Sequence, residues 1–250
     1  MHEVLDPETD ALVHAGWVSR LPWLVQGTTT RGAEAEPNDF ALFGGEEDRP
    51  AVRRRWSALA SGAAVTRAVH ARQVHESVVR LHTAVPFDAD RLPLLVEPCD
   101  GHATADRDLM LAVTVADCVP AFLVAPAQRA IAVLHAGWRG VAAGVLEAGL
   151  DALAGLGAEP EGLLLHLGPS ICGRCYEVGP EVFAALGLPA PELPRPLDLR
   201  AVLAHRAVTA GVVPHGISVS AHCTRCTESG LFSHRGGDAQ RQLGFLAVRA

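Results

Sequence analysis

Short apolar runs bounded by turn residues mark the middle of the chain. Three of them, residues 109–115, 121–125 and 130–134, each have the length of a strand and predict the central part of a sheet. Apolar residues then recur at about helical spacing between Gly140 and Gly155, which predicts a helix directly after these strands.

The flanking sequence adds further elements. Residues 23–28 and 163–167 predict strands, and residues 54–60 predict a helix. Glycine, proline and charged residues dominate 32–55 and predict a loop, whereas the proline-rich stretch 189–196 is a connector, because core-like patterns resume after it. Together these elements predict an α+β fold in which layered mixed sheets are covered by helices and the functional site lies in loops at strand ends.

Composition limits the classes of protein that fit. The chain has 250 residues, 49% apolar and 20% charged, which is enough for a sizeable core in a single domain spanning residues 1–250. The net charge of −7 offers no basic field to a nucleic acid or an anionic membrane. The acidic first residues lack the pattern of a secretory signal, and no apolar run reaches the roughly 20 residues that span a bilayer. We therefore expect a cytoplasmic protein, whose six cysteines are reduced or bind metal.

The tetrapeptide HAGW occurs twice, at residues 14–17 and 135–138. A strand is expected before His135 and a helix after it, whereas His14 is expected to have neither neighbour. Because no repeat period accompanies the two copies, we interpret them as a coincidence rather than an internal duplication.

Three motifs place a residue that can bind metal near the end of a predicted element: QVH with His75, ADC with Cys118 and HAGWRG with His135. If the two strands before His135 form a hairpin, Pro120 pairs with His135 and Cys118 lies one diagonal away. That diagonal is roughly 7–8 Å, which Cys and His side chains can close around one ion with bonds of about 2.0–2.3 Å. His75 would complete a His₂Cys set with a fourth position open, an arrangement typical of catalytic zinc.

Each ligand candidate also has a simpler interpretation. A lone histidine at a strand end usually only forms hydrogen bonds, and a lone cysteine is usually a small buried apolar residue. A resemblance carried by these and other motifs is what favours the metal site.

The motifs occur in a specific series. RQVH, DGHATAD, TVADCVP, HAGWRG, GPSI, CYEVG, LDL, CT and LFSHR follow one another between residues 72 and 235. The series resembles the laccase-domain family, once named multicopper polyphenol oxidases and now regarded as purine nucleoside phosphorylases with adenosine deaminase and methylthioadenosine phosphorylase activities. The family usually has tyrosine where His234 stands, a difference that concerns substrate contacts more than the metal.

The resemblance implies a catalytic zinc held by His75, Cys118 and His135. It also implies purine nucleoside and inorganic phosphate as substrates, with adenosine first and inosine, guanosine or S-methyl-5'-thioadenosine as further nucleosides. The sequence leaves the preferred nucleoside and the oligomeric state open.

Phosphorolysis requires groups that hold an anion. Arginine binds phosphate through paired N–H bonds, and the turn that opens the helix near Gly140 offers unpaired backbone N–H groups. The alternatives are surface ion pairs for Arg31 and Arg235 and packing on Trp138 for Arg139. The expected contacts to substrate or phosphate are Arg31, Gln73, Arg139 and Arg235.

Deamination would require water activated at the metal and a proton carrier. The signature of cytidine-type deaminases is absent from the sequence, so the carrier would have to come from elsewhere. Asp117 and His70 are hypothetical carriers, although Asp117 is better explained as an acceptor that structures its own loop.

Two C-x-x-C pairs offer a rival zinc site, a structural one made by Cys172, Cys175, Cys223 and Cys226. However, 47 residues separate the pairs, against about 15–20 in ribbon-type sites, and the resemblance does not require the first or the last of these cysteines. We therefore expect reduced, partly buried thiols. A redox role is disfavoured because neither pair opens a clear βαβ helix.

Two rival functions remain open. Some members of the family that this sequence resembles are amidases that edit peptidoglycan precursors, where Cys118 or a zinc-bound hydroxide would attack an amide carbonyl. The other rival is a zinc-binding partner protein without enzymatic activity, in which a fourth protein ligand fills the open coordination position of the metal. Copper-dependent oxygen reduction fits least, because one His₂Cys set cannot supply several copper centres.

Overall fold

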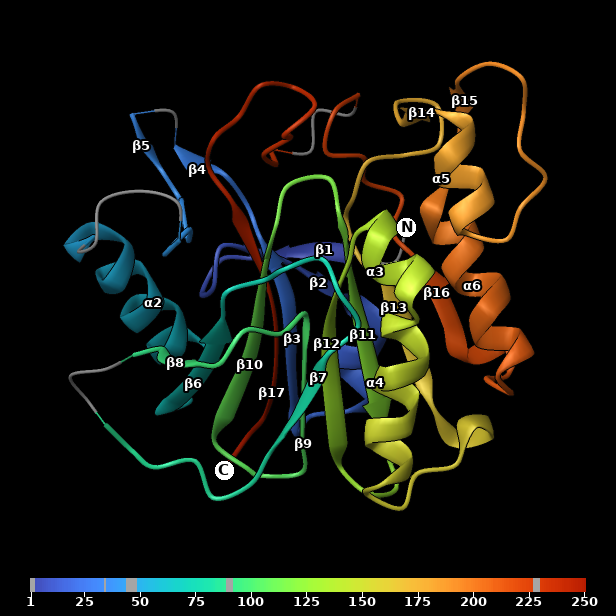
Figure 1. The fold of residues 1–250 in the computed structure, drawn as a ribbon. Helices are drawn as coiled ribbons and strands as arrows, with labels where there is room; N and C mark the ends of the chain where they lie inside the picture. The colour runs from blue at the N-terminus through green and yellow to red at the C-terminus, as the bar shows by residue number, and fades with distance from the viewer. Residues whose placement is uncertain (1–2, 34, 44–48, 89–91, 227–229) are drawn as a thin grey trace.

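Two large mixed sheets form the centre of the computed structural model, which describes residues 3–33, 35–43, 49–88, 92–226 and 230–250 (Figure 1). The first sheet has its strands in the order β1 (Glu3–Asp6), β2 (Ala11–His14), β3 (Leu24–Thr29), β17 (Gln242–Val248), β10 (Leu109–Val115), β6 (Arg67–Ala71) and β8 (Leu94–Val96). The strands from β1 to β10 pair antiparallel, and β6 and β8 extend the sheet in parallel.

The second sheet has the order β16 (Ile217–Val219), β13 (Leu164–Leu167), β11 (Val119–Ala125), β12 (Ala130–Ala136), β9 (Gly101–Thr104) and β7 (Val79–His82). Its central strands pair antiparallel, whereas the two edge strands pair parallel to their neighbours. Two short ribbons accompany the sheets, β4 (Gly32–Ala33) with β5 (Glu36–Pro37), and β14 (Glu177–Val178) with β15 (Arg195–Pro196). The helices are α1 (Ala15–Arg20), α2 (Pro50–Gly62), α3 (Trp138–Ala143), α4 (Val145–Ala154), α5 (Pro180–Ala185) and α6 (Leu199–Thr209).

Alternation along β10 shows how the layers pack. Leu111 faces the second sheet and is buried with Phe122 of β11, whereas Met110 faces away from it and is buried with Trp56 of α2. The far face of the second sheet is covered by helices, so Leu134 of β12 shares its buried cluster with residues of α3, α4 and α6. Figure 1 shows α2 on one side of the sheets and α3 to α6 on the other. Strands covered on both faces read as continuous apolar runs, which is why the central runs are so uniform.

The predicted fold class is confirmed, and so are the predicted strands. Residues 109–115 form β10, and the two following runs form β11 and β12. Their hairpin has the predicted register, with Pro120 opposite His135. The strands expected at 23–28 and 163–167 are β3 and β13, each within one residue of the prediction at either end.

Two predictions need correction. The helix expected from Gly140 to Gly155 is two helices, because Gly144 has a φ of +91° that only glycine adopts readily. The loop expected over 32–55 contains β4 and β5 and ends early, since the proline at the start of α2 suits a first helical position. Residues 34 and 44–48 of that stretch lie outside the described residues.

The first HAGW copy also differs from expectation. His14 ends strand β2 and caps α1, where its Nδ1 accepts a hydrogen bond from the backbone N–H of Trp17 at 3.2 Å. Both copies therefore join a strand to a short helix, and the argument from missing neighbours was wrong. No repeat period was found in the sequence, so the interpretation as coincidence now rests on that observation alone.

Strand directions bring three connections to one edge of the two sheets. The β6–β7 and β10–β11 connections both lead from the first sheet to the second. Because β6 and β10 are parallel neighbours, both connections leave the first sheet at the same edge, the one where the carboxyl ends of these two strands lie. Because β11 and β12 are antiparallel, the end of β12 lies beside the start of β11. QVH lies in the β6–β7 connection, ADC lies in the β10–β11 connection, and HAGWRG begins at the end of β12.

Among the described residues, the longest apolar helices fall short of what is needed to cross a bilayer.

Candidate functional site

His75, Cys118 and His135 meet at this edge of the sheets. One ligand atom from each side chain lies within 4.8 Å of the other two. The two imidazole rings are nearly perpendicular, with centroids 4.7 Å apart. His135 is buried, Cys118 is half-buried and His75 is exposed, so the cluster opens to solvent on one side. The structure therefore brings together the three residues that the sequence predicted.

Asp100, which the sequence analysis did not single out, holds two of these residues in place. Its Oδ1 accepts hydrogen bonds from His135 Nδ1 at 2.8 Å and from the backbone N–H of His75 at 2.9 Å. Its Oδ2 accepts from the backbone N–H groups of Val74 and Glu76. The loop needs this support because His75 has a φ of +62°, which is unfavourable for a residue other than glycine. A carboxylate on Nδ1 also leaves Nε2 of His135 as the metal-facing nitrogen.

Gly137 lets the cluster close. A Cβ at this position would lie 3.0 Å from Cys118 Sγ and 3.1 Å from His75 Cδ2. These approaches are tighter than most Cβ contacts, so a larger residue in place of the glycine of the HAGW motif would push on both ligand side chains.

The metal-free cluster favours a charged pair. Burial alone would raise the pKa of Cys118, but the charge of His135 and hydrogen bonds from both histidines outweigh it and lower that pKa from 9.0 to about 6. Burial alone would lower the pKa of His135, but the thiolate and Asp100 raise it to about 9. A thiolate beside an imidazole held by a carboxylate is a donor set that suits zinc and also copper.

The two pKa values predict how metal affinity depends on pH. Between about pH 6 and about pH 9 the metal-free protein carries Cys118 as thiolate and His135 as imidazolium, so binding releases one proton from this pair. We expect the affinity for Zn²⁺ to rise about tenfold per pH unit across this window and to fall more steeply below it, where the thiol also binds a proton.

Titration with Zn²⁺ against a chromophoric chelator checks this expectation. The difference between the wild type and Cys118→Ser isolates this site from any other that binds zinc. An affinity that does not change between pH 6.5 and 8.5, values that lie inside the window, would contradict the charged pair.

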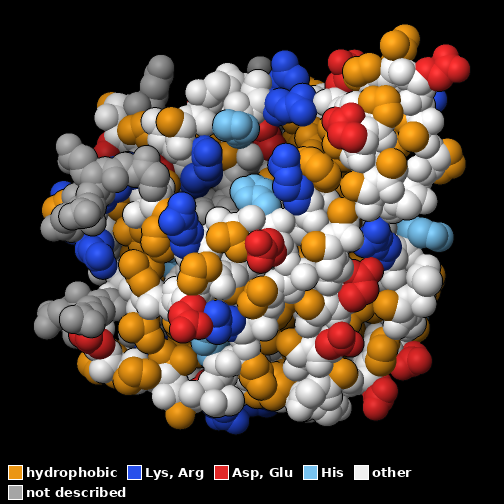
Figure 2. Space-filling model, in the orientation of Figure 1, with side chains coloured by type: hydrophobic (Ala, Val, Ile, Leu, Met, Phe, Trp, Pro, Cys, Tyr) orange, Lys and Arg blue, Asp and Glu red, His pale blue; other side chains and the backbone are white. Residues whose placement is uncertain are grey.

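Two cavities flank the cluster. One, of about 260 Å³, is lined by His75, Cys118 and the aromatic side chains Trp138 and Tyr176. The other, of about 480 Å³, lies on the side of Gln73. His75, Cys118 and His234 line both. Arginines line each of them, Arg139 and Arg235 in the first and Arg72 and Arg241 in the second. Figure 2 shows basic side chains on either side of histidines near the middle of this face.

Two of the three arginines expected to bind substrate or phosphate line a cavity, and the third forms an ion pair instead. Arg139 and Arg235 line the first cavity, and both lie over aromatic rings, Arg139 with its Cζ 4.3 Å from the ring centroid of Trp138. Arg31 forms an ion pair with Asp238 at 2.8 Å, which is the surface alternative considered above.

Gln73 lines the second cavity, but its amide is engaged with Thr114. Nε2 donates to the Thr114 carbonyl oxygen at 2.8 Å, and Oε1 accepts from the Thr114 backbone N–H at 2.7 Å. These contacts fasten the His75 loop to the end of β10. Gln73 therefore positions the loop that carries His75.

The surroundings of His70 and Asp117 do not favour a role as proton carrier for either residue. His70 is buried beside Trp56, with ring centroids 5.2 Å apart, and burial lowers its pKa to about 4. Asp117 lines the first cavity, but its carboxylate accepts from the Thr224 hydroxyl at 2.5 Å and from the Arg235 backbone N–H at 2.7 Å. Asp117 therefore structures its loop, as the simpler interpretation held.

Sequence reasoning missed Asp100, Tyr176 and Arg241 as parts of the site. Asp100 lies in the DGHATAD motif, and its carboxylate is fully buried, a combination that no local pattern reveals. Burial and the charge of Cys118 raise the pKa of Tyr176 to about 12, so its phenol stays protonated and can donate a hydrogen bond into the first cavity.

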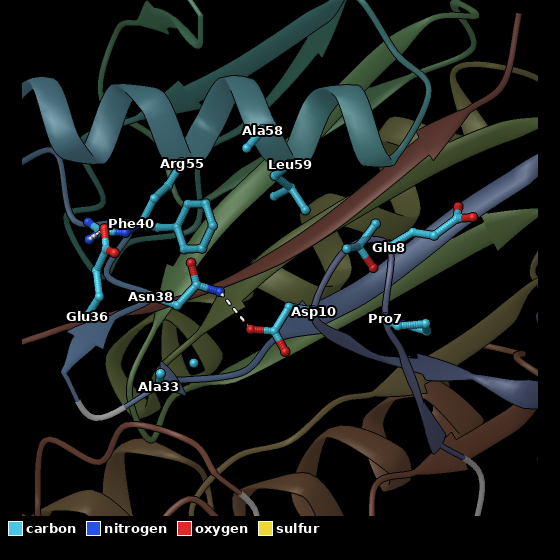
Figure 3. Close-up of a pocket in the computed structure, with 12 residues that line it drawn as sticks. Pro7, Glu8, Asp10, Ala33, Glu36, Asn38, Phe40, Arg55, Ala58 and Leu59 are labelled. Carbon is cyan, nitrogen blue, oxygen red and sulfur yellow. Dashed lines mark hydrogen bonds and ion pairs between the residues drawn. The ribbon is translucent and has the colours of Figure 1, made fainter.

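A separate cavity of about 320 Å³ lies between α2 and the turn at Pro7–Asp10 (Figure 3). Its polar groups bind one another, since Asn38 donates to Asp10 at 3.4 Å and Arg55 lies 3.5 Å from Glu36. We assign it no chemical role.

The structure removes the argument from spacing against a shared site of the two C-x-x-C pairs, whose cysteines are free thiols as expected. Cys172, Cys175, Cys223 and Cys226 form a second group, with all four sulfurs within 4.8 Å of one another. The two pairs are adjacent in space despite their separation in sequence. Two groups among the described residues can therefore hold a metal ion.

Comparison with known proteins defines the family. Residues 27–249 match the family model described as multi-copper polyphenol oxidoreductase laccase. The chain belongs to this family. This match confirms the resemblance that the motifs indicated. Several relatives of this chain are named as enzymes. A purine nucleoside phosphorylase of Mycobacterium tuberculosis is 36% identical over 227 residues, which cover 83% of this chain and 85% of that protein.

Other relatives match over shorter stretches. A purine nucleoside phosphorylase of Streptomyces coelicolor is 38% identical over 164 residues, 64% of this chain and 66% of that protein. An adenosine deaminase from an unknown prokaryotic organism is 34% identical over 160 residues, 60% of this chain and 61% of that protein. The chain thus spans slightly less than two thirds of the length of these two relatives.

The fold is shared with solved structures. YlmD from Geobacillus stearothermophilus superposes with a TM-score of 0.87 at 28% identity, covering 99% of this chain and 100% of that one. The hypothetical protein YfiH of Bacillus licheniformis gives the same TM-score at 25% identity and covers 99% of both chains.

Proposed function

We propose that this chain is a zinc-dependent purine nucleoside phosphorylase that acts on adenosine and related nucleosides and also deaminates adenosine. Residues 1–250 would act as one domain, with His75, Cys118 and His135 as metal ligands. The observation that carries the proposal is the convergence of these side chains between two arginine-lined cavities. The names of the laccase-family relatives support both activities.

Zinc fits the donor set better than a group of copper ions. The cluster is a single set of two imidazoles and one thiolate, and the other group among the described residues consists of cysteines alone. Oxygen reduction to water needs several copper centres with histidine ligands, whereas His₂Cys with an open position is a known arrangement for catalytic zinc. When bound, Zn²⁺ would supply Lewis acidity that stabilises negative charge developing on a substrate.

The side chains of the first cavity divide the remaining work. Phosphate would be bound by Arg139 and Arg235, whose planar guanidinium groups match its oxygen atoms. The ring faces of Trp138 and Tyr176 that the two arginines do not cover would give the purine flat apolar surfaces. The protonated phenol of Tyr176 would donate a hydrogen bond to the substrate.

Incubation of the purified protein with adenosine, with and without phosphate, tests the proposal. Adenine and ribose 1-phosphate that appear only with phosphate identify phosphorolysis, and inosine formed in either condition identifies deamination. Inosine, guanosine and S-methyl-5'-thioadenosine are then compared as substrates. If no nucleoside is converted by the zinc-loaded protein, the proposal fails, and a muramyl-linked serine substrate tests the amidase alternative.

Arginine substitutions test the phosphate subsite. Arg139→Ala and Arg235→Ala are each expected to raise KM for phosphate about 10- to 100-fold, because each removes a charged hydrogen-bond donor from the first cavity. KM for the nucleoside should change much less. Steady-state kinetics at varied phosphate concentration give both values.

Arg20→Ala on the exposed end of α1 is the matched control and should leave both KM values unchanged. Equal losses for phosphate and nucleoside would argue against a phosphate-specific role of the two arginines.

A further inference from the structure

We propose that Cys172, Cys175, Cys223 and Cys226 form a second metal site that binds Zn²⁺ through four thiolates, and that this structural ion fixes one wall of the first cavity. The inference concerns residues outside the His₂Cys cluster. It can be tested without substrate, so it stands or falls independently of the proposed function.

Topology explains why distant cysteines meet. Strands β13 and β16 are parallel neighbours in the second sheet, and one C-x-x-C pair follows the carboxyl end of each. Carboxyl ends of parallel strands lie at the same edge, so the pairs are brought together. Residues 168–216, which join β13 to β16, contain α5 and α6 and form the crossover that parallel pairing requires, and they include most of the 47 residues between the pairs. The long spacing is therefore a consequence of the fold and does not argue against a shared site.

The sulfur positions fit a tetrahedral ion. Cys172 Sγ lies 3.7 Å from Cys226 Sγ. With Zn–S bonds of about 2.3 Å, the edge of a tetrahedron of sulfurs measures about 3.8 Å. A disulfide would need about 2.05 Å. All four sulfurs lie within 4.8 Å of one another, close enough to share one ion.

The backbone around the cysteines suits thiolates. Cys223 Sγ accepts hydrogen bonds from the backbone N–H groups of Cys172 at 3.2 Å and Arg225 at 3.4 Å. Tight turns present both pairs, and in the first of them the N–H groups of Cys175 and Tyr176 donate to the Cys172 carbonyl. Each pair also carries an arginine directly before its second cysteine, which offsets part of the double negative charge of a zinc tetrathiolate.

The site is joined to the first cavity by short hydrogen bonds. Thr224, between two of the cysteines, donates through its hydroxyl to Asp117 and through its backbone N–H to Ser170. Asp117 in turn accepts from the backbone N–H of Arg235. Tyr176, whose ring lies 5.2 Å from Arg235 Cζ, directly follows a cysteine of the cluster. A metal ion that holds the two turns together would therefore hold Asp117, Tyr176 and Arg235 in place.

Metal content of single variants of the full chain tests the site. The wild type is expected to contain about two zinc ions per chain, one for each group. Cys226→Ser and Cys118→Ser should each contain about one, and Cys99→Ala, which removes a buried thiol outside both groups, should keep about two. Cys226 is exposed, so its replacement is not expected to disturb the core. Cobalt-loaded Cys118→Ser should show the absorption bands of a tetrahedral tetrathiolate complex.

Hydrogen exchange tests the link to the cavity wall. In Cys226→Ser the backbone amides of Ile171, Thr224 and Arg235 should exchange faster than in the wild type, whereas the amide of His75, held by Asp100, should not change. Unchanged exchange in all of them would overturn the proposed effect on the wall. One zinc per wild-type chain that is lost in Cys118→Ser but kept in Cys226→Ser, stoichiometric iron, or a disulfide between Cys172 and Cys226 would overturn the site itself.

Discussion

Cys118→Ser is expected to lose the metal of the His₂Cys cluster and to lower kcat/KM for adenosine phosphorolysis by at least about 10³-fold. The loss corresponds to several kcal/mol of transition-state stabilisation, the amount that a Lewis-acid metal supplies. A serine hydroxyl does not ionise near neutral pH, so His75 and His135 would lose the anionic ligand between them. Zinc analysis and steady-state kinetics of the same preparation measure both effects.

The control for this variant is Cys99→Ala, because Cys99 is also buried but lies outside both metal groups. It should keep its zinc content and its kcat/KM. If Cys118→Ser retained both, the thiolate would be no ligand. If it lost zinc while the wild type showed no turnover of any nucleoside, the metal site would stand and the enzymatic proposal would not.

Asp100→Asn is expected to weaken zinc binding by about 10- to 100-fold and to lower the free energy of unfolding by about 2–4 kcal/mol. Both carboxylate oxygens accept two hydrogen bonds each, from N–H groups of His75 and His135 on one side and of Val74 and Glu76 on the other. In either orientation the new NH₂ group would face two donors. Denaturant unfolding of the metal-free protein separates the loss of stability from the loss of metal.

Asp106→Asn provides a comparison, since that carboxylate accepts a backbone N–H from Ala84 at an exposed position. Its stability should change by less than about 1 kcal/mol and its zinc affinity should not change. A zinc affinity of Asp100→Asn equal to that of the wild type would show that His135 does not depend on the carboxylate for its orientation.

Several features of the fold were predictable from local pattern. The uniform apolar runs predicted β10, β11 and β12, because these strands are covered on both faces and are apolar except near their ends, where Thr114 and His135 lie. The hairpin register followed from the position of the turn, because a turn centred between residues 127 and 128 fixes every pair beyond it. Cys118 and His135 could therefore be placed side by side before the structure was known.

Other features depend on contacts between residues distant in sequence. His75 reaches Cys118 and His135 only because β6 lies parallel to β10 and because Asp100 binds the loop that carries His75. Neither contact can be recognised from the sequence around His75. The proximity of the two cysteine pairs has the same cause. Their spacing in sequence weighed against a shared site, but the parallel pairing of β13 with β16 brings the two pairs to one edge.

The sequence by itself predicted the strands β3, β10, β11, β12 and β13, the family and the three residues of the His₂Cys cluster, because apolar runs and motif order can be read from neighbouring residues. The tertiary structure decided which side chains share a cavity. It assigned Arg139 and Arg235 to one cavity wall and Arg31 to an ion pair, and it joined the four cysteines into one group. These placements depend on strand pairing and packing between segments that are distant in sequence, and these contacts exist only when the whole chain is folded.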